Sequence, residues 1–334
     1  MSKKKKYHLK PFVKKLIILF IILVIIGFFI GRYLYKQHQL EIYHNSYEYK
    51  LIQLGYQEDY QLLLDTLSND QLDVILTYPY NEFIPEFIQT KYFIFANLDE
   101  YLDQVITEED DFFKYHGTEG YDYEEIVSEV NVHVNNDYYT GDFKTDLSKE
   151  YGMLVNKYYE LGEDYIPDDL VDIDVKYYYG SKKQIRSEVY EAFKQMWEAA
   201  KEEGHYLVVI SAYRSYQHQA ETYRDYEERY GTKYADNIAA RPGYSEHQTG
   251  LCLDIYSKTN TNKETFKDSE TYNWLINNSY KYGFILRYPD GNLNIKKTGY
   301  NFESWHYRYV GVDLAKKVYE SGLTYDEYYA YYIE

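Results

Sequence analysis

Residues 245–256 read SEHQTGLCLDIY and combine a histidine, a glycine and an aspartate with alternating apolar residues. From Gly250 onward the pattern predicts a β-strand, in which Cys252 and Asp254 share one face. The opposite face is apolar and holds Leu251, Leu253 and Ile255. A carboxylate on such a strand needs a partner, which can be a cation, a hydrogen-bond donor or solvent. His247 precedes the strand closely enough to be considered with it.

A second histidine lies in residues 303–306, which read ESWH. In a strand Ser304 and His306 would share a face, so strand geometry alone does not bring Glu303 to a metal held by His306. A strand start, a turn or a bulge could do so. Two histidines and one carboxylate, with a further glutamate nearby, form a common catalytic zinc arrangement. From the spacing alone, two structural histidines and a capping aspartate remain an alternative.

Together these segments resemble a known family. The pattern Ser245-x-His247-x-x-Gly250-x-x-x-Asp254, followed by Glu303-x-Trp305-His306, is similar to the VanY-type zinc D-alanyl-D-alanine carboxypeptidases. These belong to the M15 peptidases, which include L,D-carboxypeptidases. Residues 211–219 resemble the Tyr-Arg-Ser element of that family, and residues 154–157 and 164–171 resemble the start of its domain. The resemblance covers about residues 150–322.

The resemblance implies a function for particular residues. It makes His247, Asp254 and His306 the ligands of Zn2+, and Glu303 the general base and later the general acid. It places Arg214 against the scissile carbonyl or the substrate carboxylate. Two further residues, Gln219 and Ser245, are expected to line the site. The implied fold is a compact α+β zinc peptidase domain with a mainly antiparallel sheet.

The sequence departs from the family pattern at three positions. Ala212 stands where glycine is usual, Ser304 where proline is frequent and Cys252 where alanine is usual. Because Cys252 shares the strand face of Asp254, a thiolate ligand is an alternative to a small packed thiol. None of the three changes removes a group that the chemistry needs.

The implied reaction is hydrolysis of the terminal peptide bond of a peptidoglycan stem peptide. An L,D-carboxypeptidase or an endopeptidase on the same wall peptides is the nearest alternative. A catalytically silent wall-binding module is an alternative from a different class, although the four residues of the metal and base pattern argue against it.

Charge and composition limit the other possibilities. The chain has 334 residues, a length typical of about two domains, and its 45% hydrophobic content makes wholesale disorder unlikely. Nine basic and no acidic side chains fall in residues 1–36, which leaves a charge of −27 on the rest. Because this negative charge would repel the phosphates of nucleic acids, we expect no nucleic-acid partner. The single Cys252 excludes an intrachain disulfide.

The N-terminal residues predict a membrane anchor. Residues 16–31 form an uncharged, strongly apolar run, and Tyr33 to Tyr35 extend it, so we expect a transmembrane helix over residues 16–35. A cleaved signal peptide is the alternative, but no small-residue cleavage site follows the run. The lysines in the basic tail, residues 1–15, place the N-terminus in the cytoplasm and the rest outside. We therefore expect a single-pass protein of the cell membrane with an extracellular catalytic domain.

The remaining segments divide into an accessory region and the catalytic domain. Residues 37–135 predict short helices, among them 42–54 and one with a capping box from Ser68 to Gln71, and suggest a helical spacer or accessory region. Beyond these the pattern predicts helices over 185–200, 215–230 and 313–321, and strands over 206–211, 250–256, 295–300 and 304–310. Residues 323–334 are expected to form a tyrosine-rich tail.

Overall fold

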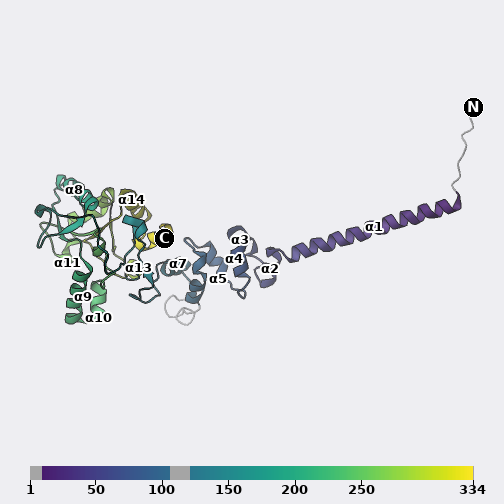
Figure 1. The fold of residues 1–334 in the computed structure, drawn as a ribbon, viewed down its shortest axis with the longest axis horizontal. Helices are drawn as coiled ribbons and strands as arrows, with labels where there is room; N and C mark the ends of the chain where they lie inside the picture. Colours follow the sequence, from purple (N-terminus) through teal and green to yellow (C-terminus); the bar gives the residue numbers. More distant parts are fainter. Residues whose placement is uncertain (1–9, 106–120, 334) are drawn as a thin grey trace, which may run out of the picture. The chain divides into compact units, whose positions relative to one another are not determined.

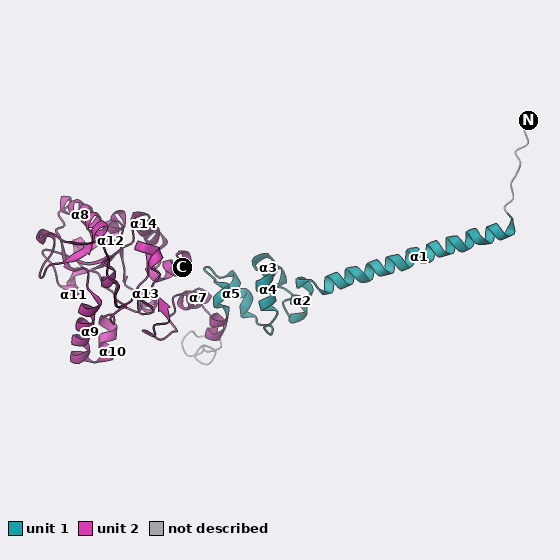
Figure 2. Ribbon diagram, in the orientation of Figure 1, with its two compact units in different colours: residues 1–98 teal, residues 99–334 magenta. Residues whose placement is uncertain are grey.

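The computed structural model describes residues 10–105 and 121–333 and separates the chain into two units (Figure 2). The first unit comprises residues 1–98 and the second residues 99–334. Residues 1–9 of the basic tail lie outside the described part. Residues 121–135, which we expected in the helical spacer, belong to the second unit.

A single long helix opens the first unit. Helix α1 spans Pro11–His44, its most apolar stretch has a mean hydropathy of 2.9, and none of its residues is buried (Figure 1). By length and composition it could cross a membrane. It continues past the expected anchor and ends at His44, so the helix expected over 42–54 is broken. Ser46 begins a new helix by accepting a hydrogen bond from the Tyr49 amide.

The rest of the first unit consists of short helices with capped ends. The capping box of Ser68 and Gln71 is present, as the sequence predicts. The buried side chains of this bundle include Leu51, Leu63 and Phe87. The elements are α2 (Tyr47–Leu54), α3 (Tyr60–Thr66), α4 (Asn69–Ile75), α5 (Phe83–Gln89) and η1 (Phe95–Asn97).

A four-stranded antiparallel sheet organises the second unit, in the order β5-β6-β8-β7. Its strands are β5 (Leu207–Ser211), β6 (Cys252–Ser257), β7 (Phe284–Leu286) and β8 (His306–Tyr309). Two small sheets accompany it, one of β1 (Phe143–Lys144) with β2 (Tyr159–Glu160), the other of β3 (Leu170–Asp172) with β4 (Gln184–Arg186). The domain therefore has the α+β class and the mainly antiparallel sheet expected from the sequence.

The main core lies between this sheet and helix α8 (Ser187–Glu202). Val189, Phe193 and Met196 recur at helical spacing on α8 and are fully buried. They belong to one apolar cluster with Leu253 and Ile255, which confirms the apolar face predicted for β6. The polar face of β6 is thereby turned away from α8, toward the functional residues described below.

Further helices complete the domain around the sheet. Helices α9 (Tyr216–Tyr230) and α10 (Thr232–Ile238) pack side by side (Figure 1). The other elements are α7 (Tyr123–Asn131), η2 (Leu147–Gly152), η3 (Val175–Tyr177), η4 (Glu246–Thr249), α11 (Lys263–Phe266), α12 (Glu270–Asn278), η5 (Ser279–Tyr282), α13 (Asn292–Thr298) and α14 (Val312–Ser321).

Two segments near the C-terminus differ from expectation. The strand expected over 295–300 is helix α13, which glycines bound on both sides, with Gly299 in the left-handed conformation at φ 71°. The segment is short and has few apolar residues, so its pattern fits a strand or a helix. The expected tail contains helix α15 (Tyr325–Tyr332), which begins with a capping box of Thr324 and Glu327. Tyr325 and Tyr329 are almost fully buried, so this helix is part of the core.

The start of α9 gives a first testable prediction. Ser215 caps the helix as predicted, because its side chain accepts a hydrogen bond from the His218 amide at 3.2 Å. Ser215→Ala should lower the free energy of unfolding by about 1 kcal/mol, as for other N-cap serines. Urea unfolding measures the change, with Ser215→Thr as the control that keeps the acceptor. An alanine variant as stable as the wild type would contradict the capping role.

Candidate active site

All seven site residues expected from the sequence line one cavity of about 660 Å³ in the second unit. They are Arg214, Gln219, Ser245, His247, Asp254, Glu303 and His306. They come from segments almost 100 residues apart in the chain, and the sheet brings them together.

His247 lies in η4, directly before strand β6. Its Nδ1 is 2.7 Å from the Ala212 carbonyl oxygen, which can only accept, so Nδ1 carries the proton. The lone pair of Nε2 therefore faces Asp254, whose Oδ1 is 3.6 Å away. Burial, followed by the charge of Arg214, lowers the pKa of His247 to about 3. The neutral imidazole is the form that binds a metal. Position 212 contributes its backbone carbonyl, which any residue there supplies.

His306 opens strand β8 and lies directly opposite Asp254 in the antiparallel ladder. Its Nδ1 is 3.2 Å from Asp254 Oδ1, and its Nε2 is 3.1 Å from Glu246 Oε2. Nε2 forms a hydrogen bond with Glu246, whose carboxylate can only accept, so Nε2 carries a proton. The contact of Nδ1 with Asp254 is not a hydrogen bond, and in the neutral imidazole Nδ1 presents its lone pair to the cavity. Cross-strand pairing thus fixes two of the three expected ligands relative to each other.

The carboxylate of Asp254 has an unsatisfied oxygen. Oδ1 is buried and has no hydrogen-bond partner among the described residues, although two imidazole nitrogens lie within 3.6 Å. Burial alone would raise the pKa of Asp254, but His247, His306 and Arg214 outweigh it and lower that pKa. A carboxylate oxygen and two imidazole nitrogens facing one another are a donor set that suits a divalent cation, and Zn2+ in particular.

Cys252 is a possible alternative to Asp254 as the third ligand. Its sulfur and a nitrogen of each of His247 and His306 lie within 4.8 Å of one another. However, the thiol is fully buried, and burial raises its pKa, which opposes the thiolate that a metal requires. Asp254 Oδ1 lies 3.6 and 3.2 Å from the nitrogens of His247 and His306, and the pKa of Asp254 is lowered by these histidines and Arg214. Ease of ionisation therefore favours Asp254 over Cys252.

Glu303 reaches the same place because a turn precedes strand β8. The His306 amide donates to the Glu303 carbonyl at 3.3 Å, and the Glu303 amide donates to the Tyr288 carbonyl at 3.1 Å. This turn, which the strand pattern could not specify, places Glu303 Oε2 3.7 Å from His306 Nδ1. Burial raises the pKa of Glu303 to about 7, a value suited to proton transfer near neutral pH.

Arg214 lines the cavity and is held there by both backbone and side-chain contacts. Its amide donates to the His247 carbonyl at 3.0 Å. Its guanidinium donates to Gln219 Oε1 at 2.8 Å and to Ser211 Oγ at 3.1 Å. Gln219 is itself fixed, since its Nε2 donates to the Ala240 carbonyl at 2.7 Å. The geometry therefore makes Gln219 a support for Arg214.

Ser245 differs from these two residues. It lines the cavity, and its side chain makes no hydrogen bond with any residue in the described parts of the chain. Its hydroxyl is thus available to a ligand in the cavity.

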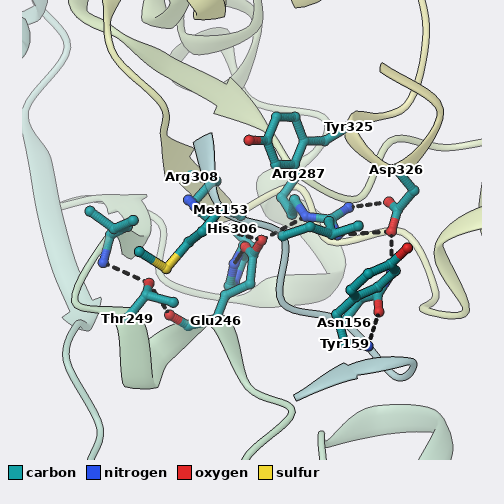
Figure 3. Close-up of polar contacts among 12 residues, drawn as sticks. Met153, Asn156, Tyr159, Glu246, Thr249, Arg287, His306, Arg308, Tyr325 and Asp326 are labelled. Carbon is teal, nitrogen blue, oxygen red and sulfur yellow. Dashed lines mark hydrogen bonds and ion pairs between the residues drawn. The ribbon is translucent and has the colours of Figure 1, made fainter. Parts of the chain in front are cut away.

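Three buried charged residues next to the site were missed by the sequence analysis. Glu246, Arg287 and Arg308 have fully buried side chains and meet one another directly behind His306 (Figure 3). Glu246 lies between Ser245 and His247, two residues expected in the site. This position in the motif was the signal that could have identified it. Nothing local in the sequence pointed to the two arginines.

With this geometry established, comparisons with known proteins identify the family to which the chain is similar. A family model described as VanY, D-alanyl-D-alanine carboxypeptidase, matches residues 182–312. The chain is 43% identical over 181 residues to the putative carboxypeptidase YodJ of Bacillus subtilis, covering 53% of this chain and 66% of the relative. It is 38% identical over 158 residues to a D-alanyl-D-alanine carboxypeptidase of Enterococcus faecalis, covering 45% of this chain and 56% of the relative.

A solved structure agrees with these matches. The structure of the LdcB LD-carboxypeptidase is 39% identical, covers 59% of this chain and 94% of its own, and superposes with a TM-score of 0.53. The chain therefore belongs to the VanY family of D-alanyl-D-alanine carboxypeptidases. It spans 56 to 66% of the length of the two curated relatives.

Proposed function

We propose that this protein is a membrane-anchored, extracellular zinc D-alanyl-D-alanine carboxypeptidase, which hydrolyses the terminal peptide bond of peptidoglycan stem peptides. One observation carries the proposal: His247 Nε2, His306 Nδ1 and the unsatisfied Asp254 Oδ1 face one another beside Glu303 in a large cavity. Membership in the carboxypeptidase family supports the reaction type.

In this proposal His247, Asp254 and His306 hold Zn2+, which supplies Lewis acidity and lowers the pKa of water to about 7. Glu303 takes the proton of the attacking water and returns it to the leaving amine. Its place beside His306 Nδ1 puts its carboxylate next to the proposed ligands. A bound cation would favour the charged, proton-accepting form of Glu303.

Arg214 contributes a permanent positive charge to the same cavity. It can stabilise the developing oxyanion or bind the free C-terminal carboxylate of the substrate. The hydrogen bond from its guanidinium to Gln219 fixes its orientation before substrate arrives. Ser245, with its uncommitted hydroxyl, is the proposed second polar contact for the peptide.

The cellular location is proposed from the N-terminal sequence. Helix α1 is long and apolar enough to span a bilayer, and the lysines that precede its apolar stretch favour a cytoplasmic N-terminus. This topology puts the catalytic domain outside the cell, where peptidoglycan is found.

A second candidate function is an L,D-carboxypeptidase acting on tetrapeptides. The similarity to the LdcB LD-carboxypeptidase favours it, because that match covers 94% of the solved chain. Both activities use the same proposed groups and differ in the configuration of the residue before the cleaved bond.

Defined peptides distinguish the two activities. We expect the full-length protein, in detergent with Zn2+, to release D-alanine from a stem pentapeptide ending in D-Ala-D-Ala and to leave the tetrapeptide product intact. Mass spectrometry and D-alanine quantification measure the products. Release from the tetrapeptide alone would favour the second candidate, and no release from either peptide would favour a silent wall-binding module.

A further inference from the structure

Behind His306 lies a buried cluster of charges that the proposed reaction does not use directly. Glu246 Oε2 accepts a hydrogen bond from His306 Nε2 at 3.1 Å. Its other oxygen, Oε1, accepts from Arg287 Nε and from Arg308 Nη1, each at 2.8 Å. The side chains of Glu246 and both arginines have no exposed surface. Glu246 therefore makes three charge-assisted contacts with two oxygens.

The cluster extends to the C-terminal helix. Arg287 donates to both carboxylate oxygens of Asp326 on α15, at 2.5 and 3.1 Å, as Figure 3 shows. Asp326 also accepts from Asn156 Nδ2 at 2.8 Å. Helix α15 is itself fixed at this point, because the Tyr325 hydroxyl donates to the Gly152 carbonyl at 2.8 Å.

The four charges of the cluster balance one another. Two guanidinium groups, of Arg287 and Arg308, face two carboxylates, of Glu246 and Asp326. Nη2 of Arg308 donates to the carbonyls of Tyr151 and Met153 at 3.0 and 2.8 Å, and its Nε donates to the Tyr309 carbonyl at 3.0 Å. Removing one member of such a buried set leaves an uncompensated charge, which is strongly unfavourable.

We propose that Glu246 is a positioning residue for His306, and that helix α15 keeps Glu246 in place through Asp326 and Arg287. By accepting the Nε2 proton, Glu246 selects the tautomer and ring orientation in which Nδ1 faces Asp254. Carboxylates in this position on a ligating imidazole raise its basicity and hold its geometry. The inference rests on the proposed metal site, and Asp326 lies outside the residues that the family model matches.

The test measures metal affinity apart from turnover. The full-length protein in detergent is titrated with Zn2+ against a chromophoric chelator, and its thermal unfolding is followed without metal. Wild-type binding and hydrolysis, measured first, test the proposed function by themselves. Glu246→Gln should then weaken Zn2+ binding about 10- to 100-fold, the range for such supporting residues. An amide has one acceptor oxygen and cannot satisfy three donors.

A matched substitution controls for the loss of charge. Glu264 is exposed and lines the same cavity, so Glu264→Gln removes one negative charge without touching His306. Its Zn2+ affinity should stay within about twofold of the wild type, because exposed charges are screened by solvent. Equal losses in the two glutamine variants would overturn the positioning role.

Two further variants separate positioning from folding. Glu246→Gln combined with Arg308→Gln removes one charge of each sign and keeps the Arg287–Asp326 pair, so it should recover thermal stability relative to the single variant while Zn2+ affinity stays low. Recovery of both quantities to wild-type values would show that Glu246 acts only through charge balance and would overturn the proposal. Asp326→Asn should weaken Zn2+ binding less than Glu246→Gln, and an unchanged affinity would exclude the role of α15.

Discussion

Glu303→Gln should lower kcat for stem-peptide hydrolysis by about 10²- to 10⁴-fold, the contribution typical of general acid-base catalysis. The amide cannot accept the proton of water, but it keeps the size and polarity of the side chain. Because Glu303 Oε2 is 3.7 Å from His306 Nδ1, its carboxylate lies beside the three proposed ligands without being one of them. We therefore expect Zn2+ binding to be retained.

Metal content and kcat must be measured on the same protein preparation. Metal content is measured by mass spectrometry after dialysis, and kcat by release of D-alanine. Glu264→Gln again serves as the matched control, because it removes a carboxylate from the same cavity and should keep kcat near the wild-type value. Wild-type turnover by Glu303→Gln would show that the base has been assigned to the wrong residue.

His247→Ala should abolish stoichiometric Zn2+ binding and hydrolysis together. A lost ligand should cost more than a lost supporting residue, so we expect affinity to fall by more than about 100-fold. The substitution also leaves the Ala212 carbonyl without the Nδ1 donor at 2.7 Å. An unsatisfied buried acceptor costs about 1–3 kcal/mol, so the metal-free protein should also be less stable.

An exposed histidine offers the matched comparison for this loss. His218 lies on α9, is exposed and is not among the residues lining the cavity, so His218→Ala should keep Zn2+ and activity. Titration with Zn2+ and urea unfolding of both variants separate metal loss from instability. Full Zn2+ occupancy in a folded His247→Ala protein would exclude His247 as a ligand.

Local patterns predicted those parts of the fold that depend on neighbouring residues. The cap at Ser215, the strand expected over 206–211 and the alternation on β6 were confirmed, because each depends on a few adjacent side chains. The strand expected over 295–300 was wrong, because a short segment with little apolar content fits a helix equally well between two glycines.

The candidate site shows the same division. The motif around His247 and Asp254 could be recognised in the sequence. The pairing of Asp254 with His306 across β6 and β8 could not be predicted from strand alternation, because it joins residues far apart in the chain. The turn that brings Glu303 to His306 was left open by the sequence for the same reason. The arginines of the buried cluster carry no local signature, since their partners are up to 157 residues away.

The contacts of Arg308 and Arg287 also set the limits of an independently stable fragment. Arg308 donates hydrogen bonds to the carbonyls of Tyr151 and Met153, and Arg287 donates to Asp326. A polypeptide trimmed to the matched residues 182–312 would bury both guanidinium groups without those acceptors. Boundaries for truncation, tagging or domain grafting therefore belong before residue 151 and after residue 332, well beyond the borders of the matched region.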